Sequence, residues 1–531
     1  MNMRINKSWV GISALVITLG LHGCGGGGED TVSPASQIPV STPAQIAQAS
    51  AADYAENVNG LVTASTLKRW KDDWAGERVK LGLTGKLIVF QLTAGPIEGM
   101  DPTKAVSATN LANPDAAIST KHAPYIKPGS ANVFVYLSPS SEWIQTRSNG
   151  VIESQSVVPD GAQMDGLMKK YNIDPRNDMI VVAMGTGSNP NAMGQGRVWY
   201  ALRYWGVDKK NLALLNGGNQ WVVNNGMTAA DFQYTATAAP NSGTFSVKNL
   251  KVDNTQLQAT VEDMLRVMPK SDVNVKNDGV LIWDARSMGQ YSAGEMVEFA
   301  EDTNSDTAGI QSCTTGFCTP ANPNNYMWTF QNGGTRQGHP NGTLQVQYTH
   351  FLDPLKGFSY RPKAFLEKLV NGHVTTAQDV ADGNATVAGV GFVDGSYGLL
   401  GEGNAYQPGD ILYVYCETTF RAMITGVTAT VILGIPTRFY DGAMVEWNSL
   451  TYTTDKNGNT ILPSNSPWRT DLVSFFRPAT SNTLVDPRTI TNAYAPSTNA
   501  VVNADKAYKT GESVTSGGGR VGGAPTNPCG G

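Results

Sequence analysis

Short, continuously apolar runs recur along the chain and alternate with stretches that have the apolar period of a helix. The runs lie at residues 86–92, 132–137, 179–184, 211–215, 279–286 and 411–415. Helices are predicted at residues 61–79, 163–171, 196–205, 361–370 and 422–433. An apolar run of this length is typical of a parallel strand that is buried on both faces. The pattern predicts an α/β fold of open, mostly parallel sheets with helices on both faces.

The same order of features occurs twice, which predicts two copies of one unit. In each copy a strand is followed by Asn or Asp with Gly and then by a tryptophan, at 211–221 and at 437–447. We expect an N-terminal domain over 59–230, a linker over 231–250 and a C-terminal domain over 251–455. A C-terminal extension over 456–531 ends in a Gly-rich stretch that we expect to be disordered.

The first 24 residues have the features of a secretory signal. Arg4 and Lys7 precede an apolar stretch over 9–21 that is too short to span a bilayer. The sequence Leu-His-Gly-Cys at 21–24 resembles the cleavage motif of bacterial lipoproteins, in which Cys24 would carry the lipid; an ordinary cleaved signal is the alternative. Residues 25–58 are rich in Gly, Ser, Pro and Ala and predict a flexible linker.

The predicted lipid anchor indicates the cellular location of the protein. Two or more acyl chains make a stable anchor, so we expect a cell-envelope protein that is tethered to a membrane through its N-terminus. Gly25 rather than Asp follows Cys24, which in such lipoproteins favours the outer membrane. The net charge of −5 and the lack of a basic stripe argue against nucleic acid as a partner.

Four cysteines remain besides the lipid-bearing one. Cys313 and Cys318 lie in a loop-like stretch of an exported chain, so a small disulfide ring is the default expectation. A redox-active or metal-binding pair is the alternative, although the spacing and the lack of a nearby histidine disfavour zinc. Cys529 is free or forms an intermolecular bond. We expect no metal and no cofactor, because the sequence contains no phosphate loop and no dinucleotide fingerprint.

Cys416 differs from these cysteines because it stands between an apolar strand, 411–415, and a predicted helix, 422–433. In a strand–loop–helix unit the loop N–H groups and the helix N-terminus converge on the first loop residue and favour a thiolate there. Arg421 adds a fixed positive charge to the same loop. A buried structural cysteine is the alternative, but the polar and charged loop residues favour a reactive thiol.

Several stretches resemble the tandem-domain rhodanese-like sulfurtransferases over about residues 60–455. No single stretch is decisive, but their order and spacing are specific. They are residues 196–206, 215–218 and Trp221 in the first half, and 283–286, 338–342, 416–422 and 440–442 in the second. The resemblance implies two rhodanese-like domains with catalysis by a cysteine of the C-terminal one. It also implies a catalytically silent first domain, because residues 185–189 follow a strand without a cysteine.

In that family a six-residue loop surrounds the cysteine sulfur with backbone amides, and the sulfur carries a transferred sulfur atom as a persulfide. Residues 416–421 have this length, one residue less than the loop of the related phosphatases, which disfavours a phosphatase. Arg197 matches a family residue that binds an anionic substrate in the interdomain cleft; a surface arginine is the alternative. The resemblance implies Cys416 as the catalytic residue and a substrate site formed by Glu417, Thr418, Thr419, Phe420, Arg421 and Arg197.

Two departures put the usual substrates in question. Glu417 is acidic where family members that use thiosulfate often carry basic residues, and it would repel a dianion. Residues 150–153 replace the histidine-containing turn that assists the thiol in mercaptopyruvate-using members. Two insertions, at about 93–130 and about 292–336, are placed to cover the cleft.

The leading hypothesis is a cell-envelope sulfurtransferase, of the thiosulfate, polysulfide or 3-mercaptopyruvate type, that moves sulfane sulfur through a Cys416 persulfide. Its partners are then a small sulfur-donor anion and a thiol or cyanide acceptor. Two alternatives stay open. One is a lipid-anchored rhodanese-fold partner of an envelope electron-transfer complex, which binds envelope redox proteins. The other is thiolate-dependent handling of selenite or tellurite.

Overall fold

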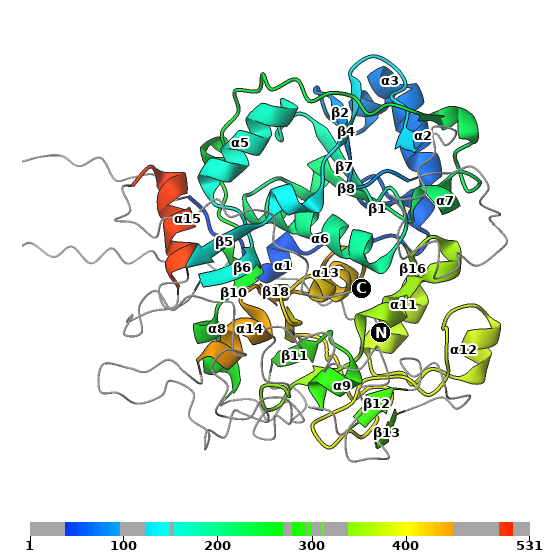
Figure 1. Ribbon diagram of the computed structural model, residues 1–531, viewed down its shortest axis with the longest axis vertical. Coiled ribbons are helices and arrows are strands. Elements are labelled where there is room, and N and C mark those ends of the chain that lie inside the picture. Colours follow the sequence, from blue (N-terminus) through cyan, green and yellow to red (C-terminus); the bar gives the residue numbers. More distant parts are fainter. Residues whose placement is uncertain are drawn as a thin grey trace, which may run out of the picture. The chain divides into compact units, whose positions relative to one another are not determined.

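Two five-stranded sheets form the centre of the structure, a computed structural model that describes residues 38–95, 124–148, 153–268, 279–292, 296–298, 310–312, 338–450 and 499–512 (Figure 1). All pairings within the two sheets are parallel. The first sheet has the order β1-β8-β7-β2-β4 and contains β1 (Gly60–Val62), β2 (Leu87–Gln91), β4 (Val133–Leu137), β7 (Met179–Ala183) and β8 (Leu212–Leu215). The second has the order β10-β18-β17-β11-β14 and contains β10 (Gln258–Ala259), β11 (Val280–Asp284), β14 (Leu344–Gln345), β17 (Ile411–Tyr415) and β18 (Thr437–Tyr440).

The two sheets share one topology. When the strands of each sheet are numbered in chain order, both sheets read 1-5-4-2-3. The register agrees as well, because β2 pairs with β7 over five residues, up to Gln91↔Ala183, and β11 pairs with β17 over five, up to Asp284↔Tyr415. The chain therefore contains two copies of one α/β unit, and the predicted fold class is confirmed.

Both faces of each sheet are covered by helices. In the first sheet α2 (Ala64–Asp72), α3 (Trp74–Lys80) and α7 (Asn219–Val222) pack on one face, and α5 (Gly161–Tyr171) and α6 (Asn189–Tyr204) pack on the other. In the second sheet the two faces are covered by α8 (Val261–Val267) with α14 (Ala443–Ser449), and by α11 (Lys363–Val370) with α13 (Arg421–Val427). Burial on both faces is the reason why the strands are continuous apolar runs.

Shorter elements connect these layers. The remaining α-helices are α1 (Pro43–Ile46), α9 (Met288–Tyr291), α12 (Ala377–Ala381) and α15 (Ala500–Thr510). Four antiparallel pairs join β3 (Tyr125–Ile126) to β9 (Phe232–Gln233), β5 (Gln145–Ser148) to β6 (Glu153–Val157), β12 (Met296–Glu298) to β13 (Ile310–Ser312), and β15 (Leu352–Asp353) to β16 (Ser359–Tyr360).

Two predicted helices differ most from those in the structure. The predicted helix over 61–79 is a strand, β1, followed by two helices, because Asp73 ends α2 and its carboxylate caps α3 by accepting from the Gly76 N–H. α6 begins seven residues before the predicted 196. Its early start follows from Ser188, whose hydroxyl caps the helix by accepting from the Asn191 N–H.

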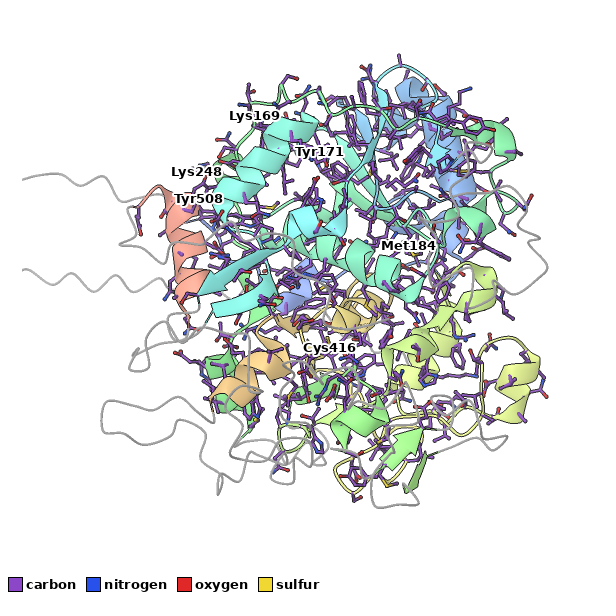
Figure 2. The ribbon with its side chains drawn as sticks, in the orientation of Figure 1. Lys169, Tyr171, Met184, Lys248, Cys416 and Tyr508 are labelled. Carbon is purple, nitrogen blue, oxygen red and sulfur yellow. The ribbon has the colours of Figure 1, made fainter. Side chains whose placement is uncertain are left out.

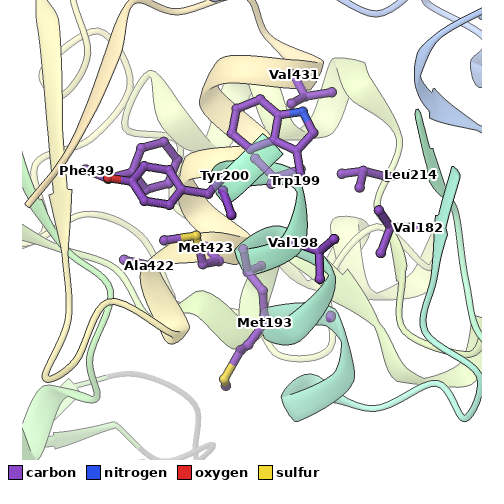
Figure 3. Close-up of a cluster of buried hydrophobic side chains, with 14 of the residues drawn as sticks. Val182, Met193, Val198, Trp199, Tyr200, Leu214, Ala422, Met423, Val431 and Phe439 are labelled. Atoms are coloured by element: carbon purple, nitrogen blue, oxygen red, sulfur yellow. The ribbon is translucent and has the colours of Figure 1, made fainter. Parts of the chain in front are cut away.

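α6 and α13 pack against each other and join the two halves (Figure 3). A Cβ added at Gly196 of α6 would lie 2.6 Å from Met423 Cβ of α13, and one added at Gly426 of α13 would lie 2.0 Å from the ring of Phe439. Tyr200 packs on the same ring, with centroids 5.0 Å apart. These contacts belong to one apolar cluster that includes strand residues of both sheets, so the two halves share a continuous core.

Residues 38–58 fall within the predicted flexible linker, but the structure packs them on both halves. α1 buries Ile46, whose carbonyl accepts from Arg203 Nη2 at 3.0 Å. Ser50 Oγ donates to the Val431 carbonyl at 3.2 Å. Residues 38–58 are therefore not a flexible linker, because a buried apolar side chain and buried hydrogen bonds hold them on the two halves.

Part of the predicted linker over 231–250 also packs on the first half. β9 pairs with β3, and Asp165 of α5 accepts from Ser246 Oγ and from the Val247 N–H, both at 2.7 Å. The connection between the two domains is therefore a bound segment at these points.

α15 belongs to the predicted C-terminal extension and packs on the first half (Figures 1 and 2). The buried Asp505 carboxylate accepts from both Nη atoms of Arg147, at 2.9 and 2.7 Å, and from Tyr204 OH at 2.8 Å. Burial alone would lower the pKa of Arg147, but the charge of Asp505 raises it above its ordinary value. Lys248 lies 4.2 Å above the ring of Tyr508. A buried ion pair thus ties the extension to the first domain.

Several predicted features lie outside the described residues. They are the signal peptide over 1–24 with Cys24, the pair Cys313 and Cys318, and most of the C-terminal extension. Among the described residues, no helix is long and apolar enough to cross a membrane. The same residues contain no group of three or more His, Cys, Asp or Glu side chains that could hold a metal ion.

Replacing Asp505 by Ala should destabilise the docked α15 strongly. The change leaves the buried Arg147 guanidinium without its carboxylate, and breaking a buried ion pair in this way costs about 3–5 kcal/mol. Urea unfolding and limited proteolysis of α15 measure the loss. Lys506→Ala on the same helix is the matched control, because that side chain is 41% exposed and lies 3.8 Å from Asp253, and an exposed pair contributes about 0–1 kcal/mol. Equal losses in the two variants would contradict the buried-pair account.

Candidate active site

Cys416 is the first residue after β17, which lies between β11 and β18 in the second sheet (Figure 2). Its side chain is fully buried, and it is the only cysteine among the described residues. The carboxyl end of an inner strand is where open α/β sheets bind ligands. The thiol therefore stands at the expected place for a functional group.

The loop over 416–420 joins β17 to α13, and all of its side chains are buried. Thr419 has φ +64°, a left-handed conformation that is uncommon for a β-branched residue. Its hydroxyl donates to the Tyr440 carbonyl at 2.8 Å and to the Asp441 carbonyl at 3.2 Å. These bonds tie the loop to the end of β18 and hold Thr419 in its strained conformation.

The start of α14 holds the beginning of the loop. The Met444 N–H donates to the Cys416 carbonyl at 3.1 Å, and the Val445 N–H donates to the Glu417 carbonyl at 3.3 Å. Two elements of the second half, β18 and α14, therefore fix the loop along its length.

Two amides of the loop are open. Within the part of the chain that the structure describes, no acceptor is bonded to the N–H of Thr419 or to that of Phe420. The helical segment that follows begins at Arg421 and continues from α13 into a π-helical stretch, η11 (Thr428–Ile432). Loop N–H groups and a helix N-terminus both favour negative charge. The arrangement suits a thiolate or a persulfide at Cys416.

Three charged side chains form a buried cluster beside the loop. Arg286 Nε lies 3.0 Å from each carboxylate oxygen of Asp284, and Arg286 Nη2 lies 2.6 Å from Oδ2. Arg286 Nη1 lies 3.3 Å from Glu417 Oε2. Tyr415 OH donates to Asp284 Oδ2 at 3.0 Å. Burial alone would lower the pKa of Arg286, but the carboxylates of Asp284 and Glu417 raise it above its ordinary value, so the guanidinium stays charged.

The contact with Arg286 reduces the repulsion that Glu417 would exert on an anionic donor. The sequence predicts that Glu417 repels a dianion, whereas the structure pairs its carboxylate with a buried guanidinium. Arg421, whose Nη1 donates to Gln290 Oε1 of α9, contributes a second positive charge. Together with Asp284 these side chains carry two negative and two positive charges. Glu417 therefore does not by itself make the site electronegative.

Arg197 projects from α6 toward the second half. Its Nη1 lies 2.6 Å from Asp441 Oδ1, both side chains are fully buried, and its Nη2 donates to the Ser156 carbonyl. Its guanidinium also lies 5.6 Å above the ring of Phe420. The structure brings Arg197 to the Cys416 loop but pairs it with a protein carboxylate. A role in substrate binding stays a prediction.

In the corresponding loop of the first half, side chains of the same domain accept hydrogen bonds from the backbone amides. Met184 is the first residue after β7, the position that the thiol holds in the second half (Figure 2). The Thr186 N–H donates to Thr93 Oγ1 at 3.2 Å, and the Gly187 N–H donates to Gln220 Oε1 at 2.8 Å. This loop has no cysteine, and its own domain occupies these two amides. The catalytically silent role of the first domain stays a prediction.

The predicted site residues come together, with additions that the sequence did not assign. Cys416, Glu417, Thr418, Thr419, Phe420 and Arg421 form one loop, and Arg197 reaches it through Phe420. Sequence reasoning assigned no role to Asp284, Arg286, Gln290 or Asp441. A signal for three of them was present, because they follow or end strands that neighbour β17, and the carboxyl ends of parallel strands share one edge of a sheet.

Comparisons with known proteins return structures only. No protein-family model matches the chain. No curated protein matches it either. The Tum1 protein from Saccharomyces cerevisiae is 15% identical over 76% of this chain and 98% of its own, with a TM-score of 0.37. SseA from Escherichia coli, described as a 3-mercaptopyruvate sulfotransferase with the rhodanese fold, is 15% identical over 72% of this chain and 98% of its own, with a TM-score of 0.38. The anaerobic ergothioneine biosynthesis enzyme from Chlorobium limicola is 13% identical over 77% of this chain and 72% of its own, with a TM-score of 0.40.

Replacing Arg286 by Met should destabilise the protein strongly. The change keeps an unbranched side chain but leaves the carboxylates of Asp284 and Glu417 buried without their cation, at a cost of about 3–5 kcal/mol. Urea unfolding measures the loss. The double variant Arg286→Met/Asp284→Asn removes one stranded charge and should recover part of the stability, so the two changes should not be additive. Strict additivity would argue against a coupled cluster.

Proposed function

We propose that the chain is a cell-envelope sulfurtransferase that moves sulfane sulfur through a persulfide on Cys416. The observation that carries the proposal is the difference between the two loops of the duplicated fold. The second loop begins with a buried thiol, and no acceptor in the described part of the chain is bonded to its Thr419 and Phe420 amides, whereas the first begins with Met184 and has amides that its own domain occupies. Retention of one anion-binding loop around a single cysteine supports chemistry on a thiolate.

The transfer is a double displacement. The Cys416 thiolate attacks the outer sulfur of thiosulfate, the S–S bond of the donor breaks, and sulfite leaves with the bonding electron pair. The protein then carries a persulfide whose outer sulfur is negatively charged. Cyanide or an acceptor thiolate attacks this outer sulfur, the persulfide S–S bond breaks, and thiocyanate or the acceptor persulfide leaves. The Cys416 thiolate is regenerated, and no external oxidant or reductant is consumed.

The loop stabilises the charge that remains on sulfur throughout the cycle. Backbone N–H groups that are fixed before the reaction act on a developing anion without reorganising. Because Cys416 is fully buried, these interactions are not weakened by water. The proposed roles are therefore charge stabilisation by the open amides and by the Arg421 guanidinium, and balancing of Glu417 by Arg286.

The envelope location is the second part of the proposal. It is supported by the secretory features of residues 1–24 and by Cys24 in a lipoprotein-like cleavage motif. An N-terminal lipid would tether the two-domain body to a membrane, with the outer membrane favoured by Gly25. Metabolic labelling with a clickable fatty acid, compared between the natural chain and Cys24→Ala, tests this part; equal labelling of both chains overturns it.

The burial of Cys416 favours a second function. A thiol that solvent does not reach is also typical of a structural cysteine. In that case the fold supplies a surface for an envelope electron-transfer complex, and the protein binds redox partners without turning over a sulfur donor.

Replacing Cys416 by Ser should abolish sulfur transfer from thiosulfate, polysulfide and 3-mercaptopyruvate to cyanide. The hydroxyl cannot hold a sulfane sulfur, so donor treatment should increase the intact mass of the natural chain by one sulfur atom but leave that of Cys416→Ser unchanged. Met184→Leu at the equivalent position of the first half is the matched control. It conserves volume and should retain both turnover and the mass increase. Undiminished turnover in Cys416→Ser would sink the proposal, and no turnover on any donor would favour the partner function.

Replacing Glu417 by Gln should lower the KM for thiosulfate. The change removes one negative charge beside the loop while Arg286 keeps Asp284 as its partner, and one such charge in a partly screened site changes the KM of a dianion by about tenfold. Steady-state kinetics with thiosulfate and with an uncharged trisulfide donor measure the effect. The uncharged donor should respond little, and an unchanged or increased KM for thiosulfate would show that Glu417 does not face the donor.

A further inference from the structure

We propose that Arg197 and Asp441 form an interdomain positioning pair, through which the first half orients the Cys416 loop and balances the charge beside it. The catalytic meaning of the pair rests on the proposed sulfur transfer. Its effect on the Cys416 thiol is measurable without any turnover.

The pair is built from both halves. Arg197 Nη1 lies 2.6 Å from Asp441 Oδ1, and neither side chain is exposed. The Val158 N–H donates to the other carboxylate oxygen, Oδ2, at 2.8 Å, and Arg197 Nη2 donates to the Ser156 carbonyl. The first half thus supplies a guanidinium, a backbone N–H and a backbone carbonyl that fix one carboxylate of the second half. Because all of these groups are buried, their interaction is weakly screened.

The backbone of Asp441 contacts the loop, so the position of Asp441 affects the loop's conformation. Asp441 directly follows β18, and its carbonyl and that of Tyr440 both accept from the Thr419 hydroxyl, at 3.2 and 2.8 Å. Thr419 has a positive φ, so these bonds hold it in a conformation that it would otherwise leave. The two open amides of the loop belong to Thr419 and Phe420. A shift of Asp441 would therefore misdirect the groups that stabilise charge on sulfur.

Arg197 also contacts the loop directly. Its guanidinium lies 5.6 Å above the ring of Phe420, the last residue of the loop. Arg197 therefore acts on the loop by two routes, through Asp441 and through Phe420. Both routes end at the residues that carry the open amides.

The pair also has an electrostatic consequence. The other charged groups that surround the loop are Asp284 and Arg286 at the end of β11, Glu417 and Arg421 in the loop, and Glu446 of α14. Against this background Arg197 and Asp441 cancel each other. Gln at position 197 leaves the Asp441 charge uncompensated and disfavours the thiolate, whereas Asn at position 441 leaves the Arg197 charge uncompensated and favours it.

This opposite response separates positioning from substrate binding. Removal of a substrate-binding arginine mainly raises the KM of an anionic donor, whereas removal of a positioning residue mainly lowers kcat. Arg197 is already bonded to Asp441, so binding a donor would require that pair to break. We therefore assign Arg197 to the loop and not to the donor.

The test is the pH dependence of Cys416 alkylation by iodoacetamide, quantified by mass spectrometry on the peptide that contains Cys416. The pH midpoint should rise by about one unit in Arg197→Gln and fall by about one unit in Asp441→Asn. The double variant Arg197→Gln/Asp441→Asn should return toward the natural midpoint. With thiosulfate, Arg197→Gln should lower kcat more than it raises KM.

Two further variants serve as controls. Arg197→Lys keeps the charge and should stay near the natural midpoint even if the loss of the guanidinium fork reduces stability. Arg203→Gln changes another buried arginine of α6, which donates to the Val207 and Ile46 carbonyls and not to the second sheet. Its midpoint should not move.

Three results would overturn the positioning pair. They are shifts of the same sign in both single variants, an equal shift in Arg203→Gln, and unmoved midpoints together with an increased KM in Arg197→Gln. Failure of the proposed sulfur transfer would give a result that can be distinguished from these three. In that case the natural chain transfers no sulfur from any donor, while the opposite shifts of the alkylation midpoint persist.

Discussion

The close contact between α6 and α13 is the constraint on which the rest of the structure depends. Each of these helices follows the loop that ends the fourth strand of its own sheet, so the contact between them also joins the two loop regions. Gly196 of α6 permits the approach, because a side chain there would collide with Met423 of α13. Gly426 lets α13 pack on Phe439 of its own sheet. The interface therefore stabilises both sheets and places Arg197 of one half within reach of Asp441 of the other.

The two loops of the duplicated fold differ in the groups that surround them. Both halves have the same strand order and the same step from strand to loop to helix. In the first half the uncharged side chains of Thr93 and Gln220 accept hydrogen bonds from two loop amides, so these amides are satisfied without a ligand. In the second half a thiol and nearby ionic groups take that place. The first half contacts the end of β18 through Arg197 of α6 and through the Val158 N–H, which directly follows β6.

Local pattern was sufficient for the long central strands, and insufficient for the short edge strands and wherever a long-range partner decides the outcome. Residues 411–415 were predicted as a strand and form β17, because burial on both faces demands continuous apolar side chains. The helix predicted over 61–79 failed because Asp73 caps a second helix there. The packing of residues 38–58 was missed because their partners, such as Arg203 and Val431, lie far away in sequence.

The sequence by itself determined the α/β class, the duplication and the position of Cys416 in a loop between strand and helix, because each of these depends on residues that are close together in the chain. Only the tertiary structure decided which charges around the site are paired. From the sequence, Glu417 is expected to repel an anionic donor, and Arg197 to bind one or to lie on the surface. In the folded protein Arg286, 131 residues away, balances the first, and Asp441, 244 residues away, balances the second. Coulombic pairing depends on distance in space and on burial, and neither can be predicted from residues that are close together in the chain.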